Sequence, residues 1–254
     1  MKKTVLLILS CMLTFSSMAT ITRVVVRAKA KDAKFIGSSM GGAHIIVRNA
    51  ITNEILAQGK TTGATGNTML IMKTDLKRGM AITDDRTARF QANIDLKEPV
   101  FVQIEAHGPM NRKQATAMAS TQLWLIPGKH ILGDGVILEI PGFVVDILSP
   151  RTHRFIPLDE VKNAPLKIQA NIVMMCGCSI SKGGTWDSDE IDVKAMVKKE
   201  GQPFSELPMA LDSVNFFEGS LSVTEPGTYE VLVYAYHARS GNTGVDRVTY
   251  IISE

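Results

Sequence analysis

The sequence predicts an all-β protein with two consecutive β-sandwich domains behind a cleaved signal peptide. Apolar and polar residues alternate with a period of two along most of the chain, as they do in half-buried strands. Turn-forming stretches such as TTGATGNT, PGKH, GDG, EPGT and RSGNTG separate these runs. Helical periodicity is limited to MNRKQATAMAS at residues 110–120, which fits a short helix. We expect a signal peptide over 1–19, a first sandwich over 20–155 and a second, immunoglobulin-like sandwich over 156–254.

The N-terminal segment has the three parts of a secretory leader. Lys2 and Lys3 form a basic start, residues 5–15 an apolar core, and residues 17–19 a cleavage site with small side chains. The apolar core is too short to span a bilayer, and no later run approaches the roughly 20 apolar residues of a spanning helix. We therefore expect an exported protein of the periplasm or the extracellular space, with a mature chain that starts near Thr20 and has no transmembrane segment.

Lipidation of Cys11 is the alternative for this segment, because ILSC at residues 8–11 loosely resembles a lipobox. We favour ordinary cleavage, since the apolar stretch continues past Cys11 and Leu9 fits its position poorly. The exported chain meets oxidising conditions, which allow disulfides to form.

The net charge of the mature chain is close to zero. The full chain has 28 basic and 25 acidic residues, and loss of Lys2 and Lys3 leaves 26 against 25, a net charge of +1. Basic residues are interspersed with acidic ones and form no stripe beside aromatic side chains, so we expect no nucleic-acid partner. One basic cluster alternates with apolar residues over 24–31, and we interpret it as the solvated face of a strand. Its members are Arg23, Arg27, Lys29, Lys31 and Lys34.

Six segments show the alternation of a strand most clearly. They cover residues 24–31, 43–48, 102–106, 166–172, 191–198 and 229–235. The segment LSPRTHRFIPLDEVKNAPL at residues 148–166 interrupts the pattern with three prolines and mixed charges. We place the boundary between the two domains inside this segment, near residue 155.

The stretch GGAHIIVRNAITNEILAQGKTTGATGNT, within residues 40–68, resembles the opening of prealbumin-like or carboxypeptidase-regulatory-like sandwich modules. Those modules place a small residue and alternating apolar residues before a turn series of the form TGE-L-A-G-T-G. The resemblance covers about thirty residues and implies a sandwich fold without implying a function. The corresponding residues here are Thr52, Asn53, Glu54, Leu56, Ala57, Gly59, Thr61 and Thr62.

The stretch EPGTYEVLVYAY, followed by SGNTGVD, resembles the last hairpin of bacterial immunoglobulin-like domains, and the likeness covers residues 160–254. It implies a tyrosine corner, in which the Tyr229 hydroxyl bonds to the backbone between strands E and F. An antibody-type domain has its second cysteine two residues later, where this chain has Val231. The inter-sheet disulfide of those domains is therefore not expected, and Cys176 and Cys178 are left to each other, to a ligand or to another chain.

Both cysteines of the mature chain lie in VMMCGCSISKGGTWDSD at residues 173–189. Even-numbered residues are apolar over 166–172, and the same register puts Met174, Cys176 and Cys178 on the buried face. If the strand continues, the sulfur atoms fill the core beneath Trp186. If it ends or bulges at Gly177, they reach a rim that is open to solvent.

Three interpretations of the cysteine pair stay open. Cys176 and Cys178 can form a disulfide, which needs a kink because Cα atoms two apart in a straight strand are roughly 6.5 to 7 Å apart. A strained bond of this kind is easily reduced and would suit a redox protein. Two thiolates and a thioether instead select Cu(I), with Met174, Cys176 and Cys178 as ligands and Met175 or a remote methionine as an extra one. The third interpretation is a pair of inert, buried thiols.

The acidic residues Asp187, Asp189 and Asp192 offer oxygen ligands for calcium, but the glycine and terminal glutamate of an EF-hand loop are absent. We favour a solvated turn that leads into the next strand. No hydrolase or phosphate-binding signature appears, and the histidines show neither metal nor catalytic spacing. They are His44, His107, His130, His153 and His237.

These patterns favour a non-catalytic binding protein that presents Met174, Cys176 and Cys178 to a soft metal such as Cu(I) or to a thiol partner. The first alternative is a thiol–disulfide redox protein that uses Cys176 and Cys178, although C-G-C at a strand end lacks the helix N-terminus of thioredoxin-type sites. The second is a structural interaction protein whose strand edges and loops contact an unidentified protein partner.

Overall fold

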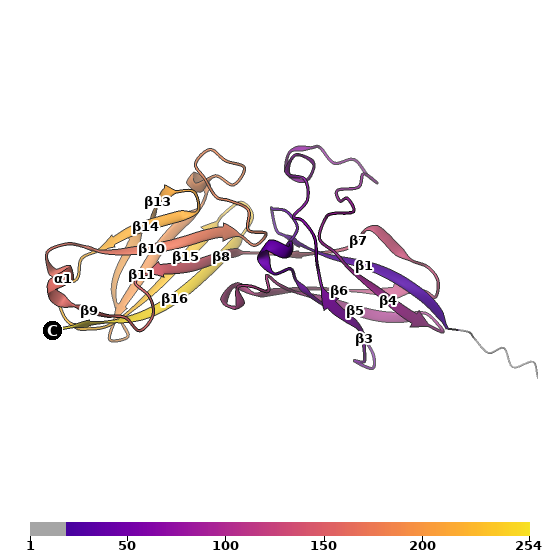
Figure 1. Cartoon of the computed structure of the whole chain (residues 1–254), viewed down its shortest axis with the longest axis horizontal. Coiled ribbons are helices and arrows are strands. Elements are labelled where there is room, and N and C mark those ends of the chain that lie inside the picture. Colours follow the sequence, from indigo (N-terminus) through magenta and orange to yellow (C-terminus); the bar gives the residue numbers. More distant parts are fainter. Residues whose placement is uncertain (1–18) are drawn as a thin grey trace, which may run out of the picture.

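The computed structural model describes residues 19–254, which form two β-sandwiches arranged along the long axis of the molecule (Figure 1). Residues 1–18 of the predicted leader, including Cys11, lie outside the described residues. The all-β prediction is confirmed, because the one α-helix within residues 19–254 is the short α1 (Leu158–Lys162). No helix of this described part is long and apolar enough to cross a bilayer. Its other short helical segments are η1 (Ser38–Met40), η2 (Met69–Lys73), η3 (Lys113–Ala115) and η4 (Ser188–Glu190).

The first sandwich has one sheet with the strand order β4-β1-β7 and another with the order β3-β2-β5-β6. Strand β1 pairs with β7 in parallel, and the other neighbours are antiparallel. A long connection over residues 61–89 separates β3 from β4 and loops out from the sheets in Figure 1. The strands are β1 (Thr20–Ala30), β2 (His44–Asn49), β3 (Ile55–Lys60), β4 (Phe90–Leu96), β5 (Val100–Gly108), β6 (Ala117–Leu125) and β7 (Ile131–Ile140).

The second sandwich has the strand orders β13-β14-β10-β8 and β12-β11-β15-β16-β9. With β8, β10, β11, β13, β14, β15 and β16 taken as strands A to G, the two sheets contain ABED and CFG. This is the order of an immunoglobulin-like sandwich, so the predicted fold of this half is confirmed. The strands are β8 (Phe143–Ser149), β9 (Phe155–Pro157), β10 (Leu166–Met174), β11 (Asp192–Lys199), β12 (Gln202–Pro208), β13 (Ala210–Ser213), β14 (Phe216–Leu221), β15 (Gly227–His237) and β16 (Asn242–Ser253).

The change from one pair of sheets to the other occurs between β7 and β8. Strand β8 pairs with β10 of the second sandwich, with Met174 opposite Phe143. The expected boundary near residue 155 would have left β8 in the first domain. The proline-rich segment at 148–166 is instead an internal connection of the second sandwich, because it contains β9 and α1 and joins two paired strands.

Strand β1 is buried on both faces over residues 24–28, which corrects the interpretation of Arg27 as part of a solvated face. Val24 and Val26 face the core, but Arg27 on the opposite face is only 1% exposed. The Arg27 guanidinium donates hydrogen bonds to the backbone oxygens of Thr87 and Ala88, at 2.5 and 3.1 Å. It also donates to the backbone oxygens of Gly133 and Asp134, both at 3.2 Å. Arg27 thus anchors the end of the 61–89 connection to the sheet.

The short helix expected over residues 110–120 is mostly a strand. One helical turn, η3, is followed directly by β6. Along β6, Met118 and Ser120 are exposed whereas Ala117 and Ala119 are half-buried, which is the period of a sheet surface. Pairing with β5 therefore overrides the helix propensity of this alanine-rich stretch.

Candidate functional site

The two cysteines form a disulfide in a tight turn directly after β10. Their sulfur atoms are 2.07 Å apart and their Cα atoms 5.4 Å apart. The Gly177 amide donates to the Met174 oxygen at 2.7 Å, and the Met174 amide donates to the Cys178 oxygen at 3.2 Å. Gly177 has a φ of +74°, which glycine adopts readily. The strand therefore ends at Met174, before this glycine, and the turn brings the two Cα atoms within disulfide range.

The disulfide turn is buried, so of the two predicted outcomes burial of the sulfur atoms is observed and exposure at an open rim is not. Cys176 is 1% exposed and Cys178 is 8% exposed. The first sandwich covers the turn, because a Cβ atom on Gly177 would lie 2.7 Å from the Met40 sulfur. A glycine is thus required at this position both by its backbone conformation and by the close approach of Met40.

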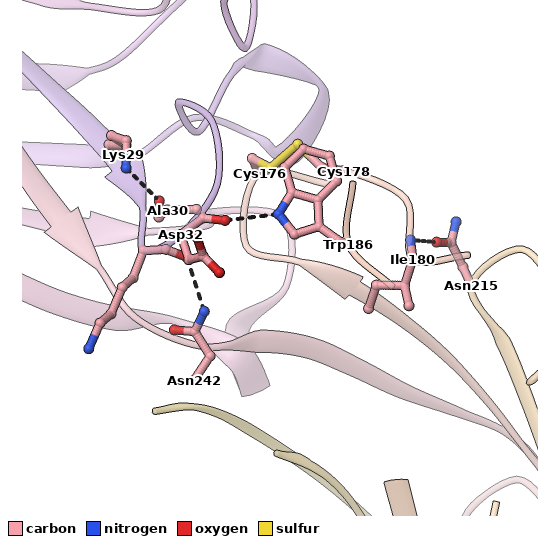
Figure 2. The surroundings of a disulfide bond; sticks show 10 residues. Lys29, Ala30, Asp32, Cys176, Cys178, Ile180, Trp186, Asn215 and Asn242 are labelled. Carbon is pink, nitrogen blue, oxygen red and sulfur yellow. Dashed lines mark hydrogen bonds between the residues drawn. A yellow bond between two sulfur atoms is a disulfide. The ribbon is translucent and has the colours of Figure 1, made fainter. Parts of the chain in front are cut away.

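Polar contacts join the two sandwiches beside the disulfide (Figure 2). The Trp186 indole nitrogen donates to the Asp32 backbone oxygen at 2.8 Å. The fully buried Asn242 donates to the Lys31 oxygen at 3.0 Å and accepts from the Gly142 amide at 2.9 Å. Asn242 therefore links β16 both to the end of β1 and to the β7–β8 connection. We call this region the junction; it contains residues 31–40, 142, 174–187 and 242.

His237 lies next to the junction, and sequence reasoning did not place it there. Its side chain is 8% exposed, and its Nε2 lies 3.5 Å from a carboxylate oxygen of Glu190. Its Nδ1 is 2.8 Å from the Ser240 hydroxyl and 3.9 Å from Asp32 Oδ2. His237 lies about sixty residues from the cysteines in the chain, and only the meeting of β10 and β15 at one end of the sandwich indicates their proximity.

The two cysteines that the soft-metal interpretation uses as ligands are bonded to each other in this structure. Met174 lines a small hollow with Trp186 and His237, whereas neither cysteine lines it. Because Cys176 and Cys178 are bonded to each other, they offer no thiolate to a metal. Among residues 19–254, no group of three or more histidine, cysteine or acidic side chains is placed to hold a metal ion. The observed bond favours the disulfide interpretation over Cu(I) binding and over inert thiols.

The three aspartates have separate partners. Asp187 accepts a hydrogen bond from the Asp189 amide at 3.1 Å and caps η4. Backbone hydrogen bonds from Asp189 and Gly183 lower the pKa of Asp187 below its ordinary value. The Asp189 carboxylate lies 3.7 Å from the Lys182 ammonium. The Asp192 carboxylate lies 4.0 Å from the Lys194 ammonium on β11. These contacts are those of a solvated turn and a strand surface.

The tyrosine corner is present. The Tyr229 hydroxyl donates to the Glu225 backbone oxygen at 2.9 Å, and the Tyr229 ring stacks on Tyr250 with 5.6 Å between centroids. Val231 is fully buried in β15, at the position where antibody-type domains have a cysteine. Apolar packing therefore replaces the inter-sheet disulfide at this position.

Comparison with known proteins gives remote structural likenesses. No family model and no curated protein matches the chain. The fibronectin(III)-like modules of Clostridium thermocellum CbhA are 12% identical over 92% of this chain and 94% of theirs, with a TM-score of 0.28. Drosophila N-cadherin EC1-4 is 10% identical over 92% of this chain and 51% of its own, with a TM-score of 0.30. An engineered protein is 20% identical over a match that covers 48% of this chain and 22% of the engineered one, with a TM-score of 0.33. The fold assignment therefore rests on the strand order.

Proposed function

We propose that this chain is an exported, non-catalytic binding protein in which the Cys176–Cys178 disulfide braces the junction of two sandwiches. The observation that carries the proposal is the burial of the bonded pair beneath Met40 of the first sandwich. A redox protein or a copper carrier must expose its sulfur atoms to a partner. Export is supported by the disulfide itself, because such bonds persist outside the reducing cytosol.

The long connection over residues 61–89 is the surface we assign to binding. Loops longer than about 12–15 residues are uncommon in compact domains and usually have a function. Arg27 fixes the end of this connection, while Met69, Leu76 and Met80 are 61%, 50% and 41% exposed. Exposed methionine and leucine side chains on an anchored loop suit contact with a protein partner.

Thiol counting under native and denaturing conditions tests the role of the disulfide. We expect no alkylation of Cys176 or Cys178 in the untreated protein. Mild reductant should leave the folded protein unlabelled for much longer than the unfolded protein, because the junction excludes the reductant. The matched control is the Cys176→Ser, Cys178→Ser double variant, which should fold and show no labelling in either state.

Two results would overturn this proposal in favour of the alternatives. Rapid reduction of the native protein, together with reduction of a disulfide-bonded test peptide, would indicate a thiol–disulfide redox protein. Stoichiometric uptake of Cu(I) after reduction that disappears in the double serine variant would indicate the soft-metal site of Met174, Cys176 and Cys178.

A further inference from the structure

The outer face of the four-stranded sheet in the first sandwich carries a row of nitrogen and sulfur side chains. His44 of β2 lies directly opposite His107 of β5, and His107 lies directly opposite Met118 of β6. Side chains that are directly opposite on one face of an antiparallel pair have Cβ atoms about 4.5–5.5 Å apart. The two imidazoles are therefore close enough to share one bound ion.

Met110 completes this cluster from the segment that follows β5. His44, His107 and Met110 line one surface hollow, together with Ile46, Lys113 and Thr116. The Met110 amide donates to the Gly42 oxygen at 3.0 Å, which ties this segment to the start of β2. The backbone of Met110 is thereby fixed near the start of β2, and its side chain, in a residue that is 41% exposed, borders the same hollow as the two imidazoles.

Neighbouring side chains fix the orientation of the His107 ring. Its Nε2 lies 3.2 Å from Glu105 Oε2, and the other carboxylate oxygen accepts from Arg48 at 3.0 Å and from Gln103 at 2.8 Å. Because an ionised carboxylate only accepts, Nε2 carries the proton and Nδ1 keeps a free lone pair. A histidine that binds a metal commonly donates its other ring N–H to a carboxylate in this way.

The imidazole of His44, unlike that of His107, makes no hydrogen bond or ion pair with any residue of the described chain. One oriented and one unoccupied imidazole thus face the hollow that Met110 borders.

From this arrangement we infer a Cu(I) site in which His44, His107 and Met110 are the ligands, with the thioether of Met118 beside them. Imidazole nitrogen binds copper and zinc, and thioether sulfur selects Cu(I). No carboxylate lines the hollow, so hard cations such as calcium find no suitable ligand there. The nearby ammonium of Lys113 further favours a monovalent ion over a divalent one.

Anaerobic competition against a chromogenic Cu(I) chelator tests this site with the mature protein. We expect one Cu(I) per chain, with at least a tenfold loss of affinity in His44→Gln, in His107→Gln and in Met110→Leu. Matched controls are Met196→Leu and His153→Asn, which alter an exposed methionine and a histidine outside the cluster and should leave the affinity unchanged. Far-UV circular dichroism checks that each variant is folded.

The Cys176→Ser, Cys178→Ser double variant separates this site from the sulfur pair of the junction. It should retain full Cu(I) uptake, whatever the redox state of the cysteines in the parent protein. Failure to withdraw copper from the chelator would overturn the inference, as would unchanged uptake in a His44→Gln, His107→Gln double variant. Equally tight binding of Zn(II) would overturn the assignment of Met110 as a ligand.

Discussion

Replacing Gly177 by alanine tests whether the disulfide turn is held by the first sandwich. A left-handed backbone costs a residue with a Cβ roughly 1–2 kcal/mol, and the φ of +74° at Gly177 lies in this region. The new Cβ would also lie 2.7 Å from Met40 Sδ and 3.0 Å from Met40 Cγ. Overpacking of this kind adds about 1 kcal/mol when a flexible side chain can move. We therefore expect Gly177→Ala to lower the free energy of unfolding by about 2–3 kcal/mol.

Urea unfolding followed by tryptophan fluorescence measures this loss. The chain has two tryptophans, so a Trp124→Phe background leaves Trp186, which lies at the junction, as the reporter. The matched control is Gly183→Ala, since Gly183 has a φ of +65° but no atom within 4 Å of the added Cβ. This control carries the backbone cost alone. If Gly177→Ala were no more destabilising than Gly183→Ala, the contact with Met40 would not hold the turn.

Four further predictions follow from buried polar groups and from the disulfide. Tyr229→Phe removes a hydrogen bond and should lower the free energy of unfolding by about 1 kcal/mol. Tyr250→Phe should leave it unchanged, because the buried Tyr250 hydroxyl has no partner among residues 19–254. Urea unfolding of the two variants compares these effects. Arg27→Met leaves four backbone oxygens of the 61–89 connection and of β7 without their donor, and it should lower the free energy of unfolding by about 3 kcal/mol. Faster proteolysis of the 61–89 connection is a second measurement of the same loss. The pKa of Glu105 is lowered by folding from its ordinary value of 4.5, so the ionised carboxylate stabilises the fold above pH 4.5. This stabilisation is lost as the pH falls through the lower pKa of the folded state. In Glu105→Gln, the free energy of unfolding should therefore fall less steeply with decreasing pH in this range. The Cys176→Ser, Cys178→Ser variant should lose about 1.6 kcal/mol, because a closed loop of roughly three residues restrains the unfolded chain only slightly; calorimetric loss of several times that value would contradict this reasoning.

Much of the fold was predictable from local sequence patterns. The alternation over 229–235 predicted a half-buried strand, and Val231 and Val233 are fully buried in β15. The corner at Tyr229 was predictable because its hydrogen bond spans only four residues of the chain. A period of two and a short-range contact are both properties of a local segment, and a single sequence contains them.

Other features depend on contacts between distant segments, and the sequence alone could not indicate them. Arg27 alternates with apolar residues like any solvated arginine, yet the chain sixty residues later returns to cover it and accepts its hydrogen bonds. The assignment of β8 depends on its pairing with β10, which the proline-rich segment between them conceals. The turn at Gly177 was one of two predicted outcomes, but its burial depends on Met40, which comes from the other sandwich.

The position of the disulfide in the chain limits what it can do for stability. A bond between residues two apart closes one of the shortest loops that a protein can form, so it removes little conformational freedom from the unfolded chain. Its effect is therefore on the shape of the turn, which it fixes against Met40 while Trp186 and Asn242 bind the neighbouring backbone. A loss of the bond should loosen the contact between the sandwiches more than it destabilises either one. Hydrogen exchange of the Lys31 to Met40 segment in the double serine variant would reveal that difference, because each sandwich core would keep its protection while the junction lost it.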